Sequence, residues 1–115
     1  MRPTKIFGFF ILSLCSVANA DKVIPMSDSL YQGKYFLLEN TKQNGINKIT
    51  YKSVFKAGTV FSKMEINCST GKYRNIGEGK SLENISTYSN KGNWIYPVDG
   101  ASDQDVLKYV CKKSS

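Results

Sequence analysis

Residues 59–68 read TVFSKMEINC, and apolar and polar side chains alternate along this stretch. Successive side chains of a β-strand point to opposite faces, so the alternation predicts a strand with one face in the core. The side chains expected to face the core are Val60, Ser62, Met64, Ile66 and Cys68. Cys68 therefore points inward, where a second cysteine has to reach it.

Similar short runs, rich in aromatic and β-branched residues, lie on both sides of this stretch. The predicted strands cover residues 34–40, 48–55, 59–68, 72–76, 80–85 (a weaker pattern) and 94–96. Turn signals at Asn44-Gly45, Ala57-Gly58 and Thr70-Gly71 separate consecutive runs, which is typical of an antiparallel sheet. Gly77 and Gly79 flank Glu78 and interrupt the pattern, so we interpret them as a bulge or a hairpin turn.

The period of the pattern changes near the C-terminus. Ser102 is a suitable helix N-cap, and Asp103 and Asp105 place negative charge in the first helical turn. The apolar side chains at helical spacing are Val106, Leu107, Tyr109, Val110 and Cys111. The sequence therefore predicts an α+β fold: a mainly antiparallel sheet of about five to six strands, with one C-terminal helix packed on one face.

The first 20 residues have the order of features that defines a signal peptide. Arg2 and Lys5 precede an apolar run over residues 6–17, which is too short to span a bilayer. Small residues at Ala18 and Ala20 predict cleavage between Ala20 and Asp21, leaving a single domain at residues 21–115 with its core at about 34–113. We therefore expect a location in the periplasm, in the medium or on the cell surface.

Three cysteines occur in the chain, and the first is expected to leave with the signal peptide. Leu14 stands before Cys15, where lipid attachment needs a small residue, so a lipid anchor is not expected. Cys68 and Cys111 then remain in an oxidising compartment, and we predict that they form a disulfide. The loop so closed has about 44 residues, for which chain entropy gives roughly 4 kcal/mol of stabilisation.

The chain has no histidine, which removes the commonest general base and metal ligand. A metal site, a cofactor and a catalytic thiol are therefore not expected, and we predict a protein that is not an enzyme. A glycosidase could still use two carboxylates facing one cleft. The acidic residues outside the helix start, however, are interpreted as solvated surface charges: Glu39, Glu65, Glu83 and Asp99.

The formal net charge of +7 falls to about +5 when Arg2 and Lys5 are removed, and the remaining lysines are scattered along the chain. Scattered charge favours attraction to acidic partners such as anionic lipid, lipopolysaccharide, glycans or acidic proteins. A nucleic-acid partner is not expected, because no basic stripe is present. No segment after residue 20 is apolar enough to predict a transmembrane span.

Three segments together resemble the bacterial surface-adhesin protein E family. They are the strand at residues 62–68 that ends in cysteine, the Tyr73-Arg74 pair, and the stretch from Trp94-Ile95-Tyr96-Pro97 through Ser102 to Cys111. The resemblance covers most of residues 34–113. It implies an antiparallel sheet with a C-terminal helix on its concave face, tethered by the cysteine pair. It also implies adhesion through binding to host matrix and plasma proteins such as vitronectin and laminin, sometimes as dimers.

Two functional hypotheses follow from the sequence. The first is a non-enzymatic binding protein, resembling surface-adhesin protein E, whose sheet surface recognises a protein or glycan partner. The alternative is a periplasmic inhibitor or immunity-type protein directed at a cell-wall hydrolase, because a rigid disulfide-linked β-domain loses little entropy on binding. Neither the ligand-binding residues nor the ligand can be named from the sequence.

Overall fold

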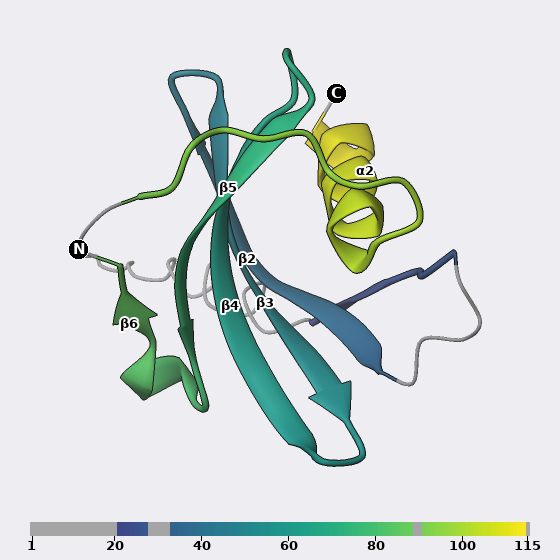
Figure 1. Cartoon of the computed structure of the whole chain (residues 1–115), viewed down its shortest axis with the longest axis vertical. Coiled ribbons are helices and arrows are strands. Elements are labelled where there is room, and N and C mark those ends of the chain that lie inside the picture. Colours follow the sequence, from purple (N-terminus) through teal and green to yellow (C-terminus); the bar gives the residue numbers. More distant parts are fainter. Residues whose placement is uncertain (1–20, 28–32, 89–90, 115) are drawn as a thin grey trace, which may run out of the picture.

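A computed structural model describes residues 21–27, 33–88 and 91–114, and its strands form one antiparallel sheet in the order β1-β2-β3-β4-β5-β6 (Figure 1). The strands are β1 (Lys22–Ile24), β2 (Lys34–Gln43), β3 (Ile46–Phe55), β4 (Gly58–Asn67), β5 (Lys72–Gly79) and β6 (Ser86–Thr87). The helix α2 (Ser102–Ser114) follows them. The predicted fold class is therefore confirmed. The predicted signal peptide lies outside the described residues, and with it Ala20 on one side of the expected cleavage site.

Four long strands form the body of the sheet, and tight turns connect them. Asn44 and Gly45 have φ values of 53° and 80°, the left-handed conformation that a two-residue hairpin turn requires. Because this turn is so short, β2 and β3 pair up to Gln43 and Ile46, beyond the predicted limits of residues 40 and 48. Of the side chains predicted to face the core, Met64 and Ile66 are fully buried, and Val60, Ser62 and Cys68 are half-buried.

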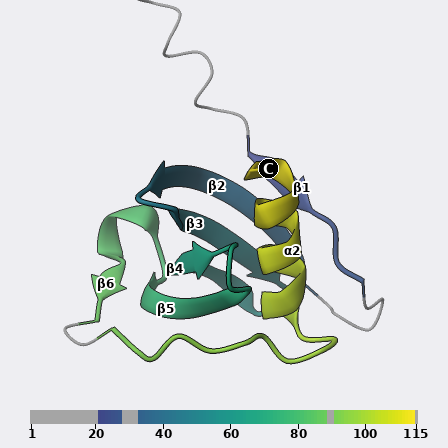
Figure 2. The same ribbon diagram turned by 90° about the horizontal axis from the view of Figure 1, so that it is seen from above.

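The helix α2 lies against one face of the sheet, and the core fills the space between them (Figure 2). Its buried side chains are Ile24, Tyr35, Leu37, Ile49, Tyr51, Met64, Ile66, Tyr73, Val106, Leu107 and Val110. Tyr109 and Cys111 pack against this cluster, so the predicted apolar stripe of the helix is confirmed. The helix begins at Ser102 itself, the residue predicted to precede it as a cap.

Two of the predicted strands are wrong. Residues 80–85 contain a short 3-10 helix, η2 (Leu82–Asn84), and the sixth strand is β6 at Ser86–Thr87. Residues 94–96 make only an isolated bridge, between Ile95 and Tyr73. The strand β1, for which the sequence has no clear pattern, completes the six by pairing with β2. The strands β1 and β6 and the bridge at Ile95 form because the edge of a longer neighbouring strand supplies their backbone hydrogen bonds.

Gly77 and Gly79 lie inside β5, so of the two predicted alternatives the hairpin turn is wrong and the bulge is supported. The register between β4 and β5 does shift next to them, since Lys63 pairs with Gly77 and Met64 with Asn75. The glycines themselves permit close contact with the next segment. A Cβ added to Gly79 would lie 2.3 Å from the carbonyl oxygen of Asn84, a distance that backbone atoms cannot tolerate.

Gly79→Ala is accordingly expected to destabilise the protein by about 1–3 kcal/mol, because the η2 segment has to move away from β5. Chemical denaturation followed by tryptophan fluorescence measures the loss. Gly92→Ala is the matched control, since a Cβ added there meets nothing within 4 Å. Equal unfolding midpoints for the two variants would contradict the close approach.

Candidate functional site

The outer edge of β5 is covered by the chain that leads from β6 to α2 (Figure 2). Ile95 pairs with Tyr73 through two backbone hydrogen bonds of 2.9 Å. Since neighbouring side chains of an extended segment alternate, Trp94 and Tyr96 project to the face opposite that of Ile95. That face is the one turned away from α2, because Tyr73 itself belongs to the core beneath the helix.

Two basic side chains of β5 hold these aromatic rings. The guanidinium carbon of Arg74 lies 4.4 Å from the centre of the Trp94 ring, and Lys72 Nζ lies 5.0 Å from the centre of the Tyr96 ring. A cation is attracted to the electron-rich face of such a ring. The two pairs are therefore cross-strand contacts that fix the 94–98 segment on the edge of the sheet.

Glu65 on β4 connects Arg74 to a second cation. Arg74 Nε donates a hydrogen bond of 2.8 Å to Glu65 Oε1, and Lys91 Nζ donates one of 3.1 Å to Glu65 Oε2. Glu65 is only 9% exposed, so its interpretation as a solvated surface charge is wrong. Burial alone would raise the pKa of this carboxyl. The hydrogen bonds and charges of Arg74 and Lys91 outweigh it and hold the pKa of Glu65 below its usual range.

A carboxyl whose pKa is lowered in the folded state stabilises the fold above its unfolded pKa. We therefore expect Glu65→Gln to lower the free energy of unfolding at pH 7 by roughly 1 kcal/mol. The difference from the unmodified protein should shrink as the pH falls through the lowered pKa of Glu65 and its carboxylate becomes protonated. Urea unfolding at pH 7 and at pH 3 measures it, with exposed Glu83→Gln as the control. A difference that stays constant with pH would contradict this account.

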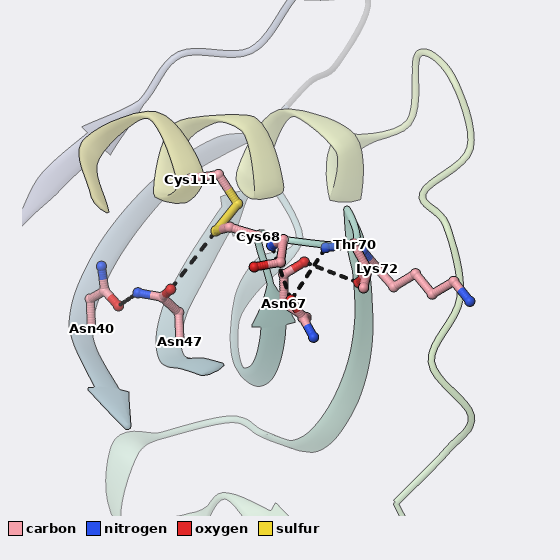
Figure 3. The surroundings of a disulfide bond; sticks show 8 residues. Asn40, Asn47, Asn67, Cys68, Thr70, Lys72 and Cys111 are labelled. Carbon is pink, nitrogen blue, oxygen red and sulfur yellow. Dashed lines mark hydrogen bonds between the residues drawn. A yellow bond between two sulfur atoms is a disulfide. The ribbon is translucent and has the colours of Figure 1, made fainter. Parts of the chain in front are cut away.

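The turn between β4 and β5 links this surface to the disulfide (Figure 3). The side-chain oxygen of Asn67 accepts hydrogen bonds from the backbone N–H groups of Ser69 and Thr70, at 3.0 and 3.3 Å. The hydroxyl of Thr70 accepts one from the N–H of Lys72 at 3.3 Å. Cys68 and Lys72 thus stand on the two sides of one hydrogen-bonded turn, and Lys72 extends away from the disulfide.

Cys68 and Cys111 form the predicted disulfide, with a Cα–Cα distance of 5.5 Å. The side chain of Asn47, which is 2% exposed, lies beside it and donates a 2.9 Å hydrogen bond to Asn40 Oδ1. Asn47 Oδ1 lies 3.8 Å from Cys68 Sγ. A disulfide sulfur carries no proton, so this is a polar contact and not a hydrogen bond. The crosslink joins the end of the central strand to the last turns of α2.

The acidic residues at the start of α2 have partners that the sequence does not indicate. The hydroxyl of Tyr73 donates a hydrogen bond to Asp103, and Asp105 accepts two of 3.1 Å from the N–H and the hydroxyl of Ser27. Burial, together with that bond to Asp103, raises the pKa of Tyr73, and burial raises the pKa of Tyr51. Both tyrosines are protonated at neutral pH, and Tyr73 acts as the hydrogen-bond donor to Asp103.

Two of the other carboxylates, Glu39 and Asp99, make hydrogen bonds. Glu39 accepts a 3.1 Å hydrogen bond from the hydroxyl of Thr50, and Asp99 accepts one of 2.8 Å from the side chain of Gln104. Among the described residues, no group of three or more Cys, Asp or Glu side chains is placed to hold a metal ion. Within the same residues, no helix is long and apolar enough to cross a membrane.

The chain was compared with known proteins in three ways. No protein-family model matches it, and neither the curated proteins nor the solved structures contain a match. Only the family resemblance joins the Tyr73-Arg74 pair to the segment that contains Trp94 and Tyr96. No pattern in the sequence indicates that Lys72 and Lys91 lie beside them.

Proposed function

We propose that this chain is an exported, non-enzymatic binding protein of the protein E-like kind, and that its 94–98 segment contacts the partner. The observation that carries the proposal is that this segment exposes apolar side chains while backbone hydrogen bonds hold it in place. Tyr96 is 66% exposed and Val98 is 72% exposed, although both follow directly on the bridge to Tyr73. Exposed aromatic side chains that are fixed in place are typical anchors of binding surfaces.

Rigidity matters because ordering a flexible loop costs free energy when it binds. Here the bridge to β5 holds one end of the segment. At the other end the N–H of Ala101 donates a 3.0 Å hydrogen bond to the carbonyl of Val98, just before α2 begins. The disulfide then ties α2 to the sheet. The proposed partner is a protein or a glycan, and the family resemblance implies a host matrix or plasma protein.

The test is binding of the purified exported protein to immobilised vitronectin, laminin and plasminogen. The double variant Tyr96→Ser/Val98→Ser is expected to weaken binding about tenfold or more, because it removes both exposed anchors. Val23→Ser is the matched control, since Val23 is 63% exposed on the opposite edge of the sheet. Absence of binding to all three proteins would reject the adhesin form of the proposal.

The same rigid segment also suits the alternative, inhibition of a cell-wall hydrolase. Tyr96 and Val98 are exposed on either side of Pro97, and exposed side chains on an anchored segment can contact the cleft of an enzyme. Inhibition assays against a panel of lysozymes separate the two functions. Inhibition that is lost in Tyr96→Ser/Val98→Ser favours the inhibitor, and full lysozyme activity at micromolar protein rejects it.

A further inference from the structure

The sheet face turned away from α2 carries a set of basic side chains in neighbouring strands. Lys48 on β3 is paired with Glu65 on β4, and Glu65 is paired with Arg74 on β5. Paired residues share a face, so these three side chains form one row across the sheet. Adjacent strands lie about 4.8 Å apart, which places the backbones of Lys48 and Arg74 about 10 Å from each other. The row leads from Lys48 toward Trp94.

A hollow of about 430 Å³ lies beside this row. Its lining includes Leu38, Glu39, Thr41, Lys48, Thr50 and Lys63, which come from β2, β3 and β4. The register of β2 against β3 shifts between Leu37 and Glu39, so Leu38 has no partner on β3. The volume falls within the range of about 300–1,000 Å³ that is usual for small-molecule sites.

The uncompensated charge in the hollow is positive. Neither Lys48 nor Lys63 forms an ion pair with any described residue. Glu39 is the one carboxylate of the lining, and it already accepts the hydrogen bond from Thr50. The residues that line this single space carry two ammonium groups, two hydroxyls and one carboxylate. Both hydroxyls already donate hydrogen bonds, Thr41 to the carbonyl of Lys48 and Thr50 to Glu39. Such a set pairs with a ligand that carries both an anionic group and neighbouring hydroxyl groups.

The position of the hollow distinguishes a glycan from a peptide. An extended peptide gains affinity by pairing its backbone with an open strand edge. The hollow lies on the face of the sheet, where the backbones of β2, β3 and β4 are already paired with one another. Only side chains are available there, and they match the hydroxyls and acidic groups of a sugar.

We infer that the ligand of this surface is a linear acidic glycan, with one carboxylate or sulfate group seated between Lys48 and Lys63. Further sugars extend along the row toward Arg74, Lys91 and the exposed ring of Tyr96. This inference rests on the proposed binding function and names the ligand class. Successive acidic groups of the glycan contact Lys48 and Lys63 and then Arg74 and Lys91. Glu39 accepts a hydrogen bond from a sugar hydroxyl.

The test measures binding of the exported protein to heparin oligosaccharides and to hyaluronan by titration calorimetry. Lys48→Gln/Lys63→Gln is expected to weaken binding about tenfold and to lower the salt dependence of the affinity. Lys56→Gln/Lys80→Gln removes the same charge from exposed positions outside the hollow and should change the affinity less than about twofold. Circular dichroism of each variant establishes that the fold is retained.

Two further polymers serve as controls: poly-glutamate is acidic but is not a glycan, and dextran is a glycan without charge. Binding of acidic glycans that depends on Lys48 and Lys63, with weak binding of both other polymers, supports the inference. Equal affinity for poly-glutamate, or equal losses in the two double variants, overturns it in favour of general charge attraction. Binding to vitronectin or laminin without binding to any acidic glycan overturns the inference and leaves the proposed function standing.

Discussion

Replacing Cys68 and Cys111 together by alanine is expected to lower the free energy of unfolding by about 4 kcal/mol. The disulfide closes a long loop, with a sequence separation of 43, and so restricts the unfolded chain strongly. A domain of this size has a total stability on the order of 5–15 kcal/mol, so the loss is a large part of the whole. Guanidinium unfolding of the double variant measures it.

Using both substitutions avoids a free thiol that could form new bonds. The unmodified protein, unfolded with and without a reducing agent, is the control, because reduction should reproduce the loss without any change of sequence. A free-energy difference under about 1 kcal/mol in both experiments would show that the crosslink adds little to the packing of α2. Partner binding should weaken as well, since Lys72 lies on the turn that Cys68 begins.

Ile66→Ala is expected to cost about 2–5 kcal/mol, the usual effect of removing a large apolar side chain from a packed core. Ile66 is fully buried, and its neighbour across the sheet is Tyr73 on β5. It belongs to the same cluster as Val106 and Val110 of α2. The cavity would therefore lie between the sheet and the helix, where few side chains can move in to fill it.

Thermal and urea unfolding of Ile66→Ala measure this cost. Val23→Ala is the matched control, because Val23 is also a β-branched strand residue but is 63% exposed on the edge strand β1. Its unfolding free energy should change by less than about 0.5 kcal/mol. Similar losses in the two variants would mean that the helix does not cover Ile66 in solution.

The surface formed by Glu65, Arg74 and residues 91–96 could be predicted from the sequence only in part. Glu65 and Arg74 face each other across a hairpin whose turn at Thr70-Gly71 is legible, so counting back from that turn would have paired them. Composition instead predicts a solvent-exposed position for every glutamate, and for Glu65 this prediction is wrong. Residues 91–96, which cover the outer edge of β5, are distant in sequence from Glu65 and Arg74. No local pattern indicates that they lie beside these residues.

The sequence by itself determined the four long strands, the C-terminal helix and the pairing of Cys68 with Cys111. These features depend on local periods of two and 3.6 residues and on a small number of cysteines, all of which are visible in a short window. Only the tertiary structure decided the places of β1 and β6, the burial of Glu65 and the hollow beside Lys63. Short segments have too few residues to show a period, and they become strands only when the edge of a longer strand offers them hydrogen bonds.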